Sequence, residues 1–153
     1  MISLNVTGEH VTGLDYELLQ QVVASLNAYL VESDLPTGEV NVRFTDNNEI
    51  RALNQRYAGH DYPTDVLSFS YLEDGATTGE LGDIAISLEM AAAQAEEAGT
   101  TLPQEVALLL VHGILHVIGY DHGTAAEQDH VDELQASVLA AAGVPYRDFK
   151  WVS

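Results

Sequence analysis

Cysteine is absent from this chain of 153 residues, and lysine and arginine are scarce. Without cysteine the chain can form no disulfides, no thiolate zinc sites and no cysteine nucleophile. Histidine is therefore the expected ligand for any transition metal. A chain without disulfides suits a reducing compartment, so we expect a cytoplasmic protein.

Long apolar runs are also missing. The longest run covers residues 106–111, which is far too short to span a bilayer. Residues 1–6 lack the basic segment and the apolar run of a signal peptide. These features predict a soluble intracellular protein with no membrane partner.

Positive charge is sparse, because 5 Lys and Arg residues stand against 24 Asp and Glu residues, a formal net charge of −19. Such a surface repels phosphate at long range, so we expect no DNA binding. We attribute the acidity to solubility or to a salt-rich cytoplasm in preference to an acidic interaction face. Three of the cations, Arg43, Arg51 and Arg56, lie close together and leave room for a local basic patch.

Hydrophobic periodicity and turn residues divide the chain into nine elements. Strands are expected over 2–6, 39–44, 65–71 and 80–87, and helices over 14–31, 46–57, 88–98, 102–118 and 125–142. The order predicts one α+β domain over 1–153, with a mixed four-stranded sheet covered by about five helices. The third and fourth strands are expected to pair as a hairpin.

Two helix starts carry capping signals. Thr45 or Asp46 is the candidate cap for the second helix, with Glu49 three residues after Asp46 as a capping-box partner. Thr101 is a candidate cap for the helix at 102–118, with Gln104 three residues later. That helix is apolar nearly all round, so we expect it to be central and buried.

Three of the six histidines fall within eleven residues, at His112, His116 and His122. Two residues four apart lie on one face of a helix, so His112 and His116 can point at one centre. Gly119 can end the helix in a left-handed conformation and turn the chain back, which brings His122 in as a third ligand. We therefore predict a three-histidine metal site at the end of the central helix, with one coordination position open for chemistry.

Zinc is the expected metal, one ion per chain, and nickel or cobalt can occupy the same site in a purified sample. The histidine spacing is also that of metzincin proteases, which carry glutamate directly after the first histidine as the general base. Here that position is Gly113. The missing base argues against a peptidase, and the group that transfers the proton stays unassigned.

The run from His112 to His122, with Tyr120 and Asp121, resembles the signature of the YbeY endoribonuclease family of bacterial rRNA-maturation factors. Two further blocks agree: Leu53-Asn54 with Tyr57 and then residues 63–69, and residues 81–87. The resemblance implies a metal-dependent endoribonuclease, a hydrolase that cuts single-stranded RNA. It would act in maturation of the 3′ end of the small-subunit rRNA and in ribosome quality control.

The resemblance carries His112, His116 and His122 over as metal ligands. It also implies rRNA and small-subunit components as partners, with ribosomal proteins or an assembly GTPase as further candidates. Asp121 is either a neighbour that supports a ligand histidine or a helix-stop residue, and both readings stay open.

Two departures from the family pattern concern RNA binding. The family usually has arginine directly after the tyrosine of the second motif, where this chain has Ala58, and lysine later in the loop, where it has His60. Arg56 is the candidate substrate-binding cation, although it lies about 200° round a helix from Ala58. A solvated helix cation is the alternative interpretation of Arg56.

The remaining candidates are weaker. Asp65 and Asp83 lie on predicted strands, where each could orient a ligand histidine or serve a structural role, and we favour the structural role. His130 is expected to be a solvated residue of the last helix, and His10 has no visible partner.

Two other functions stay open. One is a zinc-dependent hydrolase of another class, such as a peptidase or amidase, which Gly113 disfavours. The other is a non-catalytic ribosome assembly factor with a structural metal, whose acidic surface meets basic ribosomal proteins. The cleavage site, the native metal and the oligomeric state do not follow from the sequence.

Overall fold

The fold was analysed in a computed structural model that describes residues 1–8, 10–30, 36–72, 78–120 and 123–145. It contains four strands: β1 (Ile2–Thr7), β2 (Thr37–Thr45), β3 (Val66–Ser70) and β4 (Thr78–Ser87). It contains five helices: α1 (Tyr16–Tyr29), α2 (Asn47–Ala58), α3 (Leu88–Ala98), α4 (Leu102–Val117) and α5 (Ala125–Ala141). The predicted order of elements and the α+β class are confirmed.

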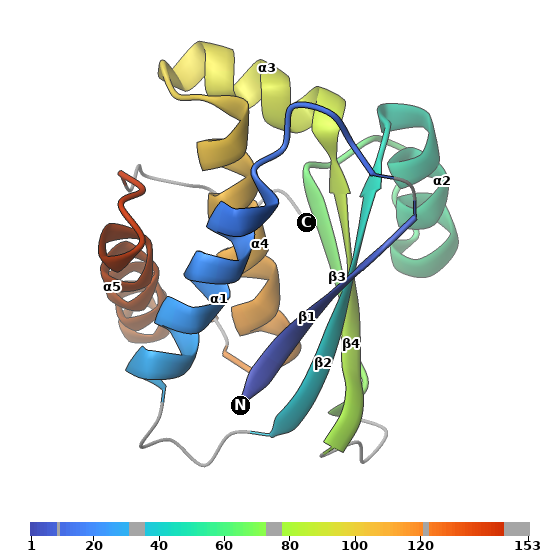
Figure 1. The fold of residues 1–153 in the computed structure, drawn as a ribbon. Helices are drawn as coiled ribbons and strands as arrows, with labels where there is room; N and C mark the ends of the chain where they lie inside the picture. Colours follow the sequence, from blue (N-terminus) through green and yellow to red (C-terminus); the bar gives the residue numbers. More distant parts are fainter. Residues whose placement is uncertain (9, 31–35, 73–77, 121–122, 146–153) are drawn as a thin grey trace.

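The four strands form one mixed sheet in the order β1-β2-β4-β3 (Figure 1). The β1–β2 and β2–β4 pairs are parallel, and the β3–β4 pair is antiparallel. The predicted pairing of the third and fourth strands is thus confirmed. Because successive strand residues point to opposite faces, each strand contributes one set of side chains to each side of the sheet.

The helices divide unequally between the two faces. Helices α1, α4 and α5 lie on one side of the sheet, and α2 lies on the other (Figure 1). The main core joins the first group to sheet residues such as Val40, Val42 and Ile84. A small cluster on the other side joins Ile50 of α2 to Ala85. We call these the covered face and the open face, because α2 spans only the β3–β4 end of the second one.

The central position predicted for the last apolar helix is confirmed, since twelve of the sixteen residues of α4 are buried. Its start is a complete capping box, in which Thr101 Oγ1 accepts from the backbone N–H of Gln104 and the Gln104 side chain accepts from the N–H of Thr101. Among the described residues, no helix is both long and apolar enough to cross a membrane.

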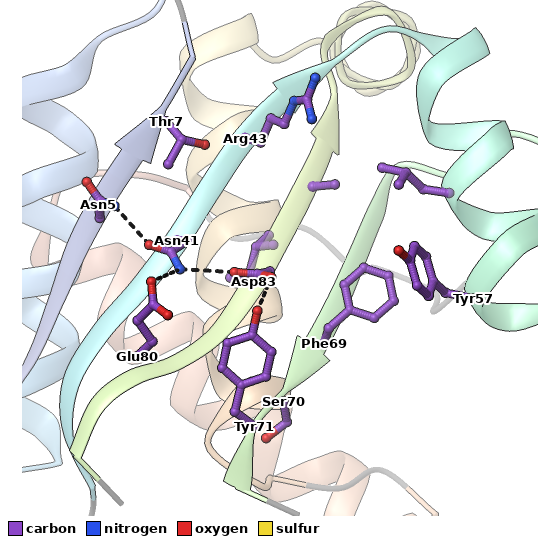
Figure 2. A pocket seen from close by; sticks show the side chains of 13 residues that line it. Asn5, Thr7, Asn41, Arg43, Tyr57, Phe69, Ser70, Tyr71, Glu80 and Asp83 are labelled. Carbon is purple, nitrogen blue, oxygen red and sulfur yellow. Dashed lines mark hydrogen bonds between the residues drawn. The ribbon is translucent and has the colours of Figure 1, made fainter. Parts of the chain in front are cut away.

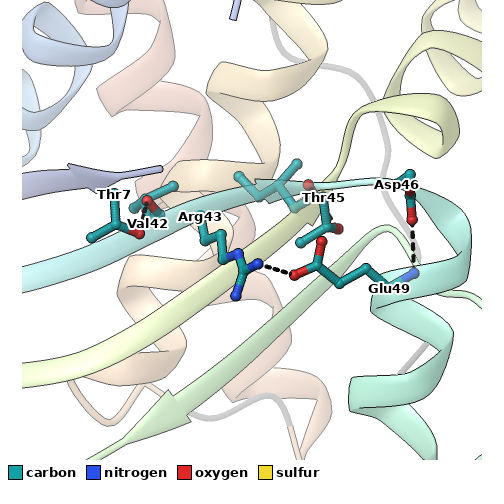
Figure 3. A network of polar contacts seen from close by, with 7 residues as sticks. Thr7, Val42, Arg43, Thr45, Asp46 and Glu49 are labelled. Atoms are coloured by element: carbon teal, nitrogen blue, oxygen red, sulfur yellow. Dashed lines mark hydrogen bonds and ion pairs between the residues drawn. The ribbon is translucent and has the colours of Figure 1, made fainter. Parts of the chain in front are cut away.

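The capping box expected for the second helix is not formed. Asp46 does cap α2, accepting from the backbone N–H of Glu49 at 2.7 Å, but the Glu49 carboxylate turns toward Arg43 and pairs with its guanidinium (Figure 3). Arg51 in turn pairs with Asp61 at 2.8 Å. The expected basic patch is therefore largely neutralised, because two of its three cations already have carboxylate partners.

Candidate functional site

The candidate metal site begins at the C-terminal end of α4. The backbone N–H of Ile118 still bonds to Ile114 at 3.0 Å, and the N–H of Tyr120 then reaches back to the carbonyl of Leu115 at 3.0 Å. Between them Gly119 has φ +99°, a conformation that side chains with a Cβ rarely adopt. The predicted glycine stop is confirmed.

His112 lies inside the protein, with 1% of its surface exposed. Its ring Nδ1 is hydrogen-bonded to the side-chain oxygen of Gln135, a fully buried residue of α5. The Gln135 oxygen faces Nδ1, an orientation that suits a proton on Nδ1 and the lone pair on Nε2, the tautomer in which Nε2 can bind a metal. This is the arrangement in which a second residue sets the tautomer and the orientation of a metal ligand.

His116 follows one helical turn later and is exposed at the end of α4. The two imidazoles thus share one end of the helix, one anchored inside and one reaching the surface. His122 and Asp121 lie outside the described residues, so the third ligand and the role of Asp121 stay predictions. Within the described ranges, no group of three histidine, aspartate or glutamate side chains converges on one point.

Gly113 is packed against the sheet. A Cβ at this position would lie 3.0 Å from Cδ1 of Ile84 and 3.2 Å from Oγ of Ser68. A glutamate here would point into the covered face and would have to bury its carboxylate among apolar side chains. The position that holds the general base in metzincins is therefore tightly packed against the sheet in this fold, which disfavours a carboxylate there and weakens the peptidase alternative further.

Asp65 and Asp83 make their hydrogen bonds with residues of the sheet, of the segments that flank it and of α3. Asp65 is buried, accepts from the N–H of Val66 at 2.7 Å and accepts from Gln94 of α3 at 3.3 Å. Burial raises the pKa of the Asp65 carboxyl. Its role is structural, as we favoured: it ties the start of β3 to α3.

Asp83 lies on the open face, where it belongs to a chain of hydrogen bonds across the sheet (Figure 2). Asn5 donates to Asn41 at 2.9 Å, Asn41 donates to Asp83 at 3.0 Å, and the Tyr71 hydroxyl donates to the second Asp83 oxygen. The hydrogen bond to the carboxylate is the main cause that raises the pKa of Tyr71 to about 12. Around this chain the open face is hollowed, with a volume of about 690 Å³.

Comparisons with known proteins identify the family of this chain. A family model described as "Endoribonuclease YbeY" matches residues 7–143. The chain belongs to the YbeY endoribonuclease family. An endoribonuclease YbeY from Geobacillus kaustophilus is 40% identical over 151 residues, 92% of this chain and 94% of that protein. One from Sulfurihydrogenibium is 52% identical over 99 residues, 64% of this chain and 65% of the relative.

The fold also has a solved counterpart. The solution structure of a Thermotoga maritima protein covers 90% of this chain and 90% of its own, with 27% sequence identity and a TM-score of 0.60. The membership inferred from the histidine run and the two flanking blocks is confirmed.

In this member of the YbeY family, the candidate substrate-binding cation, Arg56, contacts a neighbouring side chain of its own helix. The Arg56 guanidinium lies 5.3 Å from the centre of the Tyr57 ring, in a cation–π contact on the surface of α2. Ala58 ends the same helix, and Gly59 follows in a left-handed conformation. His60 faces Tyr62, with 5.3 Å between ring centres. The described structure puts no cation where the family usually has arginine.

Sequence reasoning missed Gln135. It lies on the last helix among Val131, Val138 and Leu139, so a polar residue occupies the buried stripe of an amphipathic helix. A polar residue in the apolar stripe of a helix was the signal available in the sequence, because a buried amide needs a hydrogen-bond partner. His130 is exposed on the same helix, as expected, and its ring stacks on Tyr120 with 5.9 Å between ring centres. His10 likewise has a partner, the ring of Tyr16 at 4.7 Å.

Proposed function

We propose that this chain is a metal-dependent endoribonuclease that cleaves single-stranded RNA. The observation that carries the proposal is the family match over residues 7–143, whose relatives are named as endoribonucleases. Metal dependence is supported by the Gln135–His112 contact, because a buried histidine with its Nδ1 proton engaged presents Nε2 as a ligand atom.

His112, His116 and His122 would hold one zinc ion, a set of neutral imidazoles that suits this metal. A zinc ion bound there supplies a Lewis acid for a phosphate oxygen and lowers the pKa of a coordinated water. The chain's own contribution is orientation: Gln135 holds the His112 ring in one tautomer and in one direction. Gly119, in its left-handed conformation, follows the end of α4 and precedes the segment that carries His122.

Gly113 leaves the site without the carboxylate that would activate water next to His112. Attack by the RNA's own 2′-hydroxyl on the adjacent phosphate would form a 2′,3′-cyclic phosphate and break the bond to the 5′-oxygen of the next nucleotide. The 2′-hydroxyl would give up its proton and the departing 5′-oxygen would gain one, and neither proton transfer requires a carboxylate at position 113. That route accounts for a metal cage of the metzincin type without its protease base, and it restricts the substrate to RNA.

The biological setting follows from the family resemblance. We propose rRNA and small-subunit components as partners, 3′-end maturation and ribosome quality control as the process, and the cytoplasm as the compartment. Ribosomal proteins or an assembly GTPase are further candidate partners. Since Arg43 and Arg51 are already paired with carboxylates, bound RNA must find much of its positive charge elsewhere.

The test is digestion of single-stranded and structured rRNA fragments by zinc-loaded protein and by a His112→Ala, His116→Ala double variant. We expect the double variant to lose cleavage by at least about 100-fold, as the loss of metal chemistry implies. His10→Ala is the matched control, because it removes an imidazole that stacks on Tyr16 and lies outside the histidine run. Equal cleavage by all three proteins would point to a contaminating nuclease and overturn the proposal.

A further inference from the structure

The hollow on the open face is separate from the histidine helix. Its 13 lining residues come from the sheet strands and their ends and from α2, and none belongs to α4 or α5. Its volume of about 690 Å³ falls in the range of small-molecule sites, roughly 300–1,000 Å³. Figure 2 shows polar side chains of β1, β2 and β4 along one side and aromatic rings along the other.

The polar side is held in place by its own hydrogen bonds. Asn41 lies at its centre: its amide nitrogen donates to Asp83 at 3.0 Å and to Glu80 at 3.4 Å, and its oxygen accepts from Asn5 at 2.9 Å. Both Asp83 oxygens are engaged, since Tyr71 donates to the second. Glu80 is exposed at the rim, where one of its oxygens accepts the long hydrogen bond from Asn41. A carboxylate has further acceptor positions, so Glu80 can accept additional hydrogen bonds from a ligand.

The opposite side is largely apolar. Phe69 of β3 is half-buried, and Tyr57 of α2 meets it edge-on with ring centres 5.3 Å apart. Leu53 and Ala85 complete this wall. Tyr57 is 58% exposed although it is a large aromatic residue. An exposed ring beside fixed hydrogen-bonding groups is the combination that proteins use to stack and read an unpaired base.

The charges that line the hollow favour binding of the base of a nucleotide over binding of its phosphate. The lining carries two carboxylates, Glu80 and Asp83, against one guanidinium, Arg43, which Glu49 already neutralises. A phosphate would meet net negative charge among these side chains. An uncharged ring with N–H donors on its edge would instead meet oriented acceptors.

We propose that this hollow binds a guanine base, stacked beside Phe69 and Tyr57, with the Glu80 carboxylate accepting from the guanine edge. Guanine presents two adjacent donors there, the ring N1–H and the N2 amino group, which one carboxylate can accept together. Adenine and cytosine offer a single amino group, and uracil a single ring N–H. The base can belong to a free guanine nucleotide or to single-stranded RNA, and only the second source rests on the proposed function.

The test measures binding of the four nucleoside monophosphates to the full chain by calorimetry, with a chelator present so that no cleavage interferes. We expect guanosine monophosphate to bind at least about tenfold more tightly than the other three, the scale of one good bidentate contact. Glu80→Gln should remove that preference, because its amide places a donor against the guanine donors. Glu39→Gln makes the same change at an exposed position of β2 outside the hollow and should leave binding unchanged.

Three results would overturn the proposal: equal affinity for all four nucleotides, no binding at millimolar concentration, or equally strong competition by inorganic phosphate. A second arm compares free guanosine monophosphate with a single-stranded hexamer containing one guanosine and with a hexamer lacking it. Tighter binding of the guanosine hexamer assigns the site to RNA, and equal binding assigns it to the free nucleotide. Because cleavage is not measured, a failure of the nuclease proposal leaves this test intact.

Discussion

The two faces of the central sheet are built by the same four strands, yet they differ in packing and chemistry. On the covered face, side chains such as Ile84 are in contact with α4, and a single extra methyl group has almost no room. On the open face, Asn5, Asn41 and Asp83 form a hydrogen-bonded chain beside a hollow. This difference is possible because successive side chains along a strand point to opposite faces of the sheet and so meet different surroundings. The covered face packs against the helix that carries His112 and His116, and the open face leaves a hollow that is not filled by a helix.

The largest effect is expected from adding one methyl group to the covered face. A Cβ at position 82 would lie 2.4 Å from the backbone oxygen of Phe69 and 2.7 Å from a methyl carbon of Val117. Gly82→Ala should lower the free energy of unfolding by more than about 3 kcal/mol, since backbone cannot move aside as a side chain can. Denaturant titration followed by circular dichroism measures the change.

Gly113→Ala provides the graded comparison for that experiment. Its nearest contact is a side-chain carbon of Ile84 at 3.0 Å, which can shift, and alanine also favours a helix over glycine. We expect a loss of about 1 kcal/mol for this variant. If Gly82→Ala lowers the free energy of unfolding by no more than Gly113→Ala does, the covered face is less tightly packed than its geometry indicates.

The second prediction concerns the support of the metal site. Gln135→Leu removes the acceptor for His112 Nδ1, and loss of such a contact costs about 10–100-fold in metal affinity. Zinc affinity is measured by competition with a chromophoric chelator. Gln128→Leu is the control, because Gln128 lies on the same helix and bonds to Asp132 at 2.8 Å. Unchanged zinc affinity in Gln135→Leu would remove Gln135 from the site.

The third prediction concerns the open face. Tyr71→Phe removes the hydroxyl that donates to Asp83 and should lower the free energy of unfolding by about 1 kcal/mol, as for one partly solvated hydrogen bond. Ultraviolet titration should show one tyrosine of the wild type ionising at a pKa of about 12, and this step should vanish in the variant. Because the folded-state pKa lies above the usual value of about 10, the stabilisation is present below pH 10 and is lost as the pH rises through 12. A tyrosine spectrum identical in both proteins would contradict the assignment.

The smallest effect is expected at Asp65, and it depends on pH. Burial raises its carboxyl pKa above the unfolded value of about 3.9. The contribution of Asp65 to stability is then fully present below that value and is lost as the pH rises through the folded-state pKa. The free energy of unfolding of Asp65→Asn, relative to that of the wild type, should therefore be higher at pH 7 than at pH 3. A stability difference that is the same at both pH values, measured by denaturant titration, would contradict this sign.

Much of the fold could be predicted because its signals are local. Thr101 with Gln104, the apolar run of α4 and Gly119 each lie within a few residues of the feature that they specify. The histidine spacing and the glycine after His112 likewise indicated the family directly. Glu49 shows the limit, because its capping-box spacing was correct and its carboxylate still turned to Arg43 on another strand.

The sequence by itself determined the elements, their order and the presence of closely spaced histidines, since periodicity and capping act over one or two turns of chain. Only the tertiary structure decided that Gln135 holds His112 across 23 residues of sequence. It also decided that Asp83 faces Asn41 and Tyr71 on the face opposite the core, away from α4. Contacts between such distant residues depend on which helices cover which face of the sheet. The placement of the helices depends in turn on the apolar surface buried by the whole chain, and not on the sequence neighbours of each residue.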